Sequence, residues 1–335
     1  MLMAGKTINS QAIDSRPNQK ELYVRYLVAD IAQQEDKKES TMPETEIRHA
    51  RPEDREAVLA FCTNTWEWGD YIEYVWDEWL HDPQGVLLVV TIDSQPVAVS
   101  HLRMLNKTDA WLEGMRVDPA YRQLGLAKVL DGAMMAEARR RGATIARLVT
   151  ESANAVAVSL VERGLFRQIG AFAQFRAISE DATAKQQYGL DTPQLATQAD
   201  IDDIIGYLNT SNIFPAIGGL YYNRFIAYAI SSDLLEAKVL ARQVYILRRW
   251  HRLDGLVIAE PQQGRYGSQF SIGYIDGTTE SISLIAYALR HLVAGMGLEG
   301  INAYVPDLIM VRDAFVGAGY EWDGKIFYTY EKELT

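Results

Sequence analysis

The chain has 335 residues, of which 48% are hydrophobic, enough for two domains of ordinary size with sizeable cores. Its 33 basic and 44 acidic residues give a formal net charge of −11, which argues against a nucleic-acid partner. A single cysteine excludes an intrachain disulfide and a cysteine-based zinc site, and five scattered histidines favour no metal site.

Targeting signals are not evident in the sequence. It contains no run of 18 or more apolar residues, so we expect no membrane span. The N-terminus lacks the apolar run of a signal peptide, which predicts a cytoplasmic protein. Residues 1–43 are polar and weakly periodic, and we interpret them as a peripheral extension. Nothing in the sequence predicts the oligomeric state.

Residues 44–178 alternate between strand and helix patterns. Pro52 followed by acidic residues predicts a helix start, and Asp93-Ser-Gln-Pro96 splits two apolar runs into a hairpin. Gly142 and Gly164 end the two later helices. The expected strands are 45–51, 85–92, 97–106, 110–117, 144–151 and 166–178, and the expected helices are 52–64, 70–82, 124–141 and 154–163.

Residues 195–335 repeat this plan after a polar linker at 179–194. We expect a helix from residue 199, paired strands at 238–249 and 254–261, and then strand 269–275, helix 279–297, strand 300–305, helix 308–319 and strand 325–333. The parallel predicts a second α+β domain of the same topology, each domain having a mixed sheet flanked by helices. An unrelated α+β domain is the alternative.

The stretch 122–127 has the features of an anion site. It follows a strand and an Asp118-Pro119 turn and opens a helix, where backbone N–H groups have no intrahelical partner. Gly125 lets a phosphate approach the main chain, and Arg122 adds a guanidinium. The equivalent stretch of the second half, Asp276-Gly-Thr-Thr-Glu-Ser, would repel a phosphate, so we expect one such site per chain.

The pattern Arg122-x-x-Gly125-x-Ala127, after Val117-Asp-Pro-x-Tyr121, resembles the acyl-coenzyme A signature of the GNAT superfamily of N-acetyltransferases. The element order from 45 to 178 is also similar to that family's fold, which makes the chain look like tandem GNAT-like domains, each a twisted mixed sheet, the second without a coenzyme loop. The resemblance implies acetyl-CoA as acyl donor and no metal. It places the coenzyme against Met115, Val117, Arg122, Gln123, Leu124, Gly125, Leu126, Ala127 and Asn154.

The role of Asn154, the general base and the proton donor to the leaving thiolate each have competing interpretations. Asn154 is also a suitable helix N-cap. Glu113 is the candidate general base, because simple strand alternation puts it on one face with Trp111, Met115 and Val117; a solvent-facing residue is the alternative. Family members often protonate the leaving thiolate with a tyrosine where this chain has Val161, which leaves water, Tyr71 or Tyr74 as donors.

Residues 61–82 are the expected acceptor side and hold four of the seven tryptophans. Aromatic rings with interleaved carboxylates suit an ammonium group, so Trp66, Trp68 and Tyr71 are candidate substrate-binding residues. We expect Trp76 and Trp79 to pack in the core. Cys62 is expected there as well, rather than as a nucleophile.

These features favour an acetyl-CoA-dependent N-acetyltransferase. It would move the acetyl group to the amine of a small molecule or amino-acid-like acceptor by direct attack in a ternary complex. The alternative is a non-catalytic acyl-CoA-sensing or interaction module with the same fold, suggested by Val161 and by the degenerate second half. A third reading keeps an enzyme that transfers a longer acyl group or acylates a hydroxyl.

Overall fold

The computed structural model describes residues 45–66, 69–180, 191–264 and 267–334. The predicted extension 1–43, Trp68 and most of the linker 179–194 lie outside the described residues. Within the described ranges, no helix is both long and apolar enough to span a membrane.

The first half contains every strand and helix predicted between residues 45 and 178, at bounds within two residues of those expected. Its strands are β1 (Thr45–His49), β2 (Gly85–Ile92), β3 (Gln95–Met104), β4 (Asp109–Val117), β5 (Ile145–Glu151) and β6 (Arg167–Ile178). Its helices are η1 (Pro52–Asp54), α2 (Arg55–Cys62), α3 (Ile72–Leu80), η2 (Pro119–Tyr121), α4 (Leu126–Arg140) and α5 (Ala155–Arg163).

The second half follows a similar order, with insertions. Its strands are β7 (Gln194–Leu195), β8 (Leu220–Asn223), β9 (Ile226–Ala229), β10 (Val244–Arg249), β11 (Arg252–Gly264), β12 (Gly267–Gly277), β13 (Gly300–Pro306) and β14 (Glu321–Glu333). Its helices are η3 (Gln198–Asp200), α6 (Ile201–Thr210), α7 (Ile213–Ala216), α8 (Ser232–Leu240), α9 (Thr279–Gly295) and α10 (Ile309–Gly317). The insertions are α7 and the β8–β9 hairpin, which lie before α8.

One strand prediction in the second half is wrong at its start. Residues 238–240 end α8, and β10 begins only at Val244, because Ser231 caps α8 by accepting a hydrogen bond from the Leu234 N–H. The prediction also missed α8 itself, α7, the short strand β7 and the β8–β9 hairpin. That hairpin turns at Arg224 and Phe225, which carry none of the glycine or asparagine signals of a tight turn.

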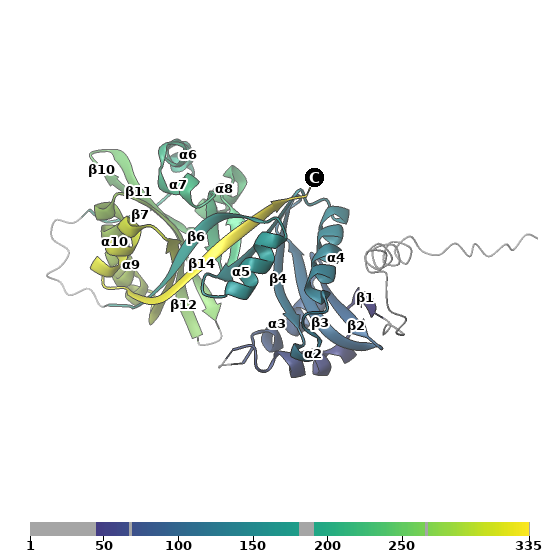
Figure 1. Cartoon of the computed structure of the whole chain (residues 1–335). Coiled ribbons are helices and arrows are strands. Elements are labelled where there is room, and N and C mark those ends of the chain that lie inside the picture. The colour runs from purple at the N-terminus through teal and green to yellow at the C-terminus, as the bar shows by residue number, and fades with distance from the viewer. Residues whose placement is uncertain (1–44, 67–68, 181–190, 265–266, 335) are drawn as a thin grey trace, which may run out of the picture.

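A single mixed sheet of 12 strands runs through both halves, in the order β1-β2-β3-β4-β5-β14-β6-β13-β12-β11-β10-β7. Each half places its last strand inside the other: β14 pairs with β5 and β6, and β6 pairs with β13 and β14. Figure 1 shows β14 in yellow crossing beside β6 to end next to the first half. The two predicted domains are therefore joined through one sheet, not only by the linker.

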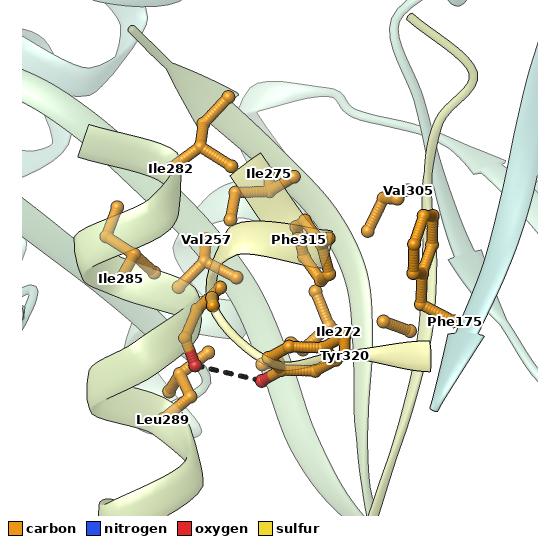
Figure 2. Packing of buried hydrophobic residues seen from close by; sticks show 14 of the residues in the cluster. Phe175, Val257, Ile272, Ile275, Ile282, Ile285, Leu289, Val305, Phe315 and Tyr320 are labelled. Carbon is orange, nitrogen blue, oxygen red and sulfur yellow. Dashed lines mark hydrogen bonds between the residues drawn. The ribbon is translucent and has the colours of Figure 1, made fainter. Parts of the chain in front are cut away.

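Helices cover both faces of this sheet. In the first half, α2 and α3 pack on one face around Trp76 and Val99, and α4 packs on the other face around Leu102 and Leu130. In the second half, α9 and α10 bury a large apolar cluster against β11 to β13. Figure 2 shows part of that cluster, where the Tyr320 hydroxyl donates a 3.0 Å hydrogen bond to the carbonyl of Ala286.

Candidate functional site

The neighbouring strands β4 and β5 part towards their C-terminal ends. They pair in parallel only from Asp109 to Trp111 on β4 and from Ile145 to Arg147 on β5. Beyond that point β4 continues along β3, and β5 continues along β14. The edge of β4 from Leu112 onward therefore faces a gap in the hydrogen-bonded sheet.

A β-bulge in β4 lies directly beside this gap. Gly114 has φ of +68°, and the pairing with β3 shifts register between Val99 and His101. The extra residue reverses the alternation of side chains that follows it. Val117 packs against the α4-side cluster, whereas Glu113 faces His101 below α3, so the prediction that they share a face is wrong.

The bulge should not tolerate a side chain at Gly114. A Cβ there would lie 2.4 Å from Cη2 of the Trp79 ring, in a backbone conformation that L residues rarely adopt. We expect Gly114→Ala to lower the free energy of unfolding by about 2–4 kcal/mol, measured by chemical denaturation.

Gly206 supplies the control for this substitution. It lies inside α6, and a Cβ there would meet nothing within 4 Å. Gly206→Ala should be neutral or stabilising by up to about 1 kcal/mol, since glycine weakens helix interiors. Equal stability of Gly114→Ala and the wild type would show that the bulge is not constrained as described.

The predicted anion loop forms the start of α4. Gln123 and Gly125 both adopt left-handed conformations, with φ of +67° and +76°. Gly125 is the N-cap without any side-chain cap, and a Cβ on it would meet nothing within 4 Å. Arg122 and Leu124 are exposed beside it. Alternating left-handed residues turn successive N–H groups towards one point, so the loop is an open nest for an anion.

The loop lies at the same end of the sheet as the gap between β4 and β5. It follows β4 through η2, and its last two members enter α4, where Leu126 is buried and Ala127 half-buried. The helix begins at Leu126 and not at residue 124, because the left-handed residues keep the loop out of the helix.

Asn154 is the N-cap of α5. Its Oδ1 accepts a 3.1 Å hydrogen bond from the Ala157 N–H, which confirms the capping interpretation. A coenzyme contact by the same side chain stays a prediction.

Glu113 is a half-buried carboxylate with a fixed partner. The Nδ1–H of His101 donates a 2.9 Å hydrogen bond to its Oε1. His101 is fully buried, stacks on Trp79 at 4.7 Å, and has its Nε2 3.5 Å from Oδ2 of Asp82. Glu113 is therefore held by a buried imidazole, which is more than a solvent-facing strand residue needs. Sequence reasoning missed the contacts of His101 with Glu113 and Asp82, because the three residues come from separate segments.

The comparisons with known proteins agree with this geometry. Residues 51–165 match the model of the acetyltransferase (GNAT) family. We call this segment the GNAT domain, after the family whose model it matches. No curated protein sequence matches the chain.

Solved structures extend the likeness over both halves. A GCN5-related N-acetyltransferase from Sphaerobacter thermophilus is 12% identical and aligns over 88% of this chain and 97% of its own, with a TM-score of 0.59. A Thermoplasma acidophilum protein described as an acetyltransferase is 16% identical over 86% of this chain and 99% of its own, with a TM-score of 0.52. A glucosamine N-acetyltransferase region of a fungal β-N-acetylglucosaminidase is 12% identical over 87% of this chain and 38% of its own, with a TM-score of 0.58. At these identities the likeness concerns the fold alone.

The rings of Trp66 and Tyr71, which we predicted to bind a substrate ammonium group, contact the guanidinium of Arg116 instead. The Arg116 guanidinium lies 4.6 Å from the centre of the Trp66 ring and 5.4 Å from that of Tyr71. It also forms a two-point ion pair with Asp70, with the shorter contact at 2.7 Å. These ring faces are thus occupied by Arg116 and not open to an ammonium group. Substrate contacts by Trp66 and Tyr71 through other atoms stay a prediction.

The other aromatic residues and the cysteine of residues 61–82 differ in their burial. Trp76 and Trp79 are buried in the core, as predicted, and so is Cys62. Burial raises the pKa of the Cys62 thiol to about 12, so it carries no thiolate at neutral pH. Burial likewise raises the pKa of Tyr71 to about 12, which keeps its phenol protonated. Tyr74 is 54% exposed.

The exchanged strand β14 brings tyrosines to the GNAT domain where the family's usual one is replaced. Val161, Tyr328 and Tyr330 all pack against the same cluster beneath α4. The Tyr330 hydroxyl donates a 3.4 Å hydrogen bond to Glu162, the neighbour of Val161. No local pattern could reveal this, since 168 residues separate the partners.

The corresponding helix start of the second half is closed. Thr278 caps α9 by accepting a hydrogen bond from the Ser281 N–H, whereas α4 has no such cap. The nearby Asp276 is 3% exposed and accepts 2.6 Å hydrogen bonds from the hydroxyls of Ser211 and Tyr274. A side-chain network occupies the place that the loop of the GNAT domain leaves open.

A pocket of about 310 Å³ lies between the GNAT domain and the second half. Arg103 of β3 forms the wall from the GNAT domain. The β8–β9 hairpin and the end of β11 form the rest, and β9 also packs against β5. Sequence reasoning placed the acceptor side at residues 61–82 and did not predict a pocket here.

Proposed function

We propose that the chain is an acetyl-CoA-dependent N-acetyltransferase that acts on the amine of a small molecule or amino-acid-like acceptor. The observation that carries this proposal is the parting of β4 and β5 beside an open anion nest. An acyl-CoA has a narrow pantetheine arm next to a diphosphate, and these two features match that shape. Family membership of residues 51–165 supports the choice of donor, because GNAT proteins use acetyl-CoA.

In this proposal the loop of the GNAT domain binds the diphosphate. The N–H groups of Gln123, Leu124, Gly125, Leu126 and Ala127 converge on it, since they lie in the nest and at the uncapped start of α4. The exposed guanidinium of Arg122 adds a charge-assisted contact. The main chain at Met115 and Val117 takes the pantetheine arm along the open edge of β4, and Asn154 makes a further contact.

Glu113 serves as the general base. Its Oε1 accepts a hydrogen bond from His101, which leaves Oε2 for a proton of the acceptor amine. The amine nitrogen then attacks the thioester carbon, the C–N bond forms, the C–S bond breaks, and the coenzyme leaves as a thiolate. An N–H on the open edge of β4 stabilises the negative charge that builds on the carbonyl oxygen.

The proposed function predicts a specific stabilisation and a specific release. Acetyl-CoA at 100 times its Kd should stabilise the protein by about 2.7 kcal/mol, seen as a raised Tm. A panel of amines and amino acids should then include acceptors that release free coenzyme thiol, followed with a thiol reagent. Absence of any stabilisation would refute the coenzyme site. Stabilisation without turnover on any acceptor would favour the acyl-CoA-sensing module.

A further inference from the structure

The pocket between the halves and the proposed base lie on the same face of the sheet. Arg103 on its wall pairs with Trp111, and His101 pairs with Glu113, so Arg103 and Glu113 are diagonal neighbours on one face of the sheet. Tyr228 also lines the pocket, and the pKa of its phenol is raised by burial and by the negative charge of Glu113. Arg103, which lines the pocket, is thus the residue that connects the pocket with the face that carries Glu113.

One cation of this pocket, Arg224, forms no ion pair with any carboxylate in the described part of the chain. Arg103 is engaged with Asp82 and Glu78, and the buried Glu260 is engaged with Lys238 at 2.9 Å. Arg224 donates a 3.0 Å hydrogen bond to the carbonyl of Gln263, and no carboxylate of the described residues lies within ion-pair distance of it.

The backbone at Arg224 has a conformation that is unfavourable for an arginine. Arg224 and Phe225 have φ of +50° and +66°, the conformation that hairpins usually fill with Asn-Gly. Bulky residues at such angles are disfavoured and cluster at functional sites. Phe225 accounts for one of them, because its ring packs edge-on against Tyr304 and Phe327 and anchors the tip. Arg224 is exposed, and its side chain makes the hydrogen bond to the Gln263 carbonyl described above.

We propose that Arg224 binds a carboxylate of the acceptor, so that the substrate class is a small amine that also carries a carboxylate. This rests on the proposed function, with the amine at Glu113 and the carboxylate held by the second half. A single guanidinium that has no carboxylate partner among the described residues, in a pocket with the buried Glu260, suits a monoanion better than a dianionic phosphate. The second half then has a definite role, as the acceptor-binding wall of the GNAT domain's site.

Arg224→Asn tests this without endangering the fold. Asparagine tolerates positive φ better than arginine, so the Tm should be unchanged or higher. The probes are the proteinogenic amino acids, each paired with its amide, which keeps the amine and removes the carboxylate. The wild type should acetylate the best acid with a kcat/KM at least about 10-fold above its amide. Arg224→Asn should lower the value for the acid about 10- to 100-fold and leave that for the amide unchanged.

Two further variants serve as controls for Arg224→Asn. Arg224→Lys keeps a charge and should retain part of the preference for acids. Arg252→Asn removes an exposed arginine at the far end of β11 and should behave as wild type.

Calorimetry with the acids and amides in the presence of CoA gives a second readout that needs no turnover. Equal use of acids and amides by the wild type, an unchanged ratio in Arg224→Asn, or neither binding nor turnover of any acid would each overturn the carboxylate site. Turnover of amides or of simple amines in those cases would leave the proposed function standing, which separates the two failures.

Discussion

Gly125→Glu should abolish acetyl-CoA binding, with the affinity falling by more than about 100-fold. Gly125 faces open space at the uncapped start of α4, so a glutamate there would place a carboxylate where the diphosphate is expected. It would also remove the close approach of the main chain, and each lost charge-assisted hydrogen bond contributes about 1.5–3 kcal/mol. Calorimetric titration with acetyl-CoA measures the effect.

Gly297→Glu is the matched control. Gly297 also has a positive φ, of +71°, and also has nothing within 4 Å of its Cβ position, but it lies just beyond the C-terminal end of α9. The Gly297→Glu variant introduces the same backbone strain and the same charge far from the loop, so its affinity for acetyl-CoA should be that of the wild type. Unaltered binding by Gly125→Glu would place the coenzyme elsewhere on the protein.

Glu113→Gln should lower kcat by about 10²- to 10⁴-fold, the usual contribution of a general base. Glutamine has the same shape and can still accept the hydrogen bond from His101, so the fold and the affinity for acetyl-CoA should persist. The rate should also lose the part of its pH dependence that a carboxylate base confers. Steady-state kinetics across a pH series measures both quantities.

The control for this variant is Glu56→Gln, an exposed carboxylate on α2 whose loss should leave kcat unchanged. A turnover number for Glu113→Gln within about twofold of the wild type would contradict the role of Glu113. The interaction with His101 would then have only a structural meaning.

Local sequence was sufficient to predict the loop and the helix start at residues 122–127. The pattern around Gly125 predicted a loop, a helix start and an anion site, because backbone conformation and orphan N–H groups depend on a few adjacent residues. The alternation of apolar residues was likewise enough to place the strands and helices of residues 45–178, and most of those in the second half.

Alternation failed where the backbone departed from a regular strand. The bulge at Gly114 moved Val117 to the other face from Glu113, and a glycine within a strand is only a weak signal of such a bulge. The aromatic residues of the segment 61–82 predict an open site for an ammonium group. In the structure Arg116 of β4, about fifty residues further along the chain, occupies that place.

The sequence by itself thus determined the loop at residues 122–127, the element order and the family likeness, all of which rest on local conformation. Tertiary structure alone decided the rest: the exchange of β6 and β14, the support of Glu113 by His101, and the pocket at Arg224. These features join segments separated by tens to hundreds of residues. Their pairing is selected by the packing of the complete fold and leaves no pattern in any short stretch of sequence.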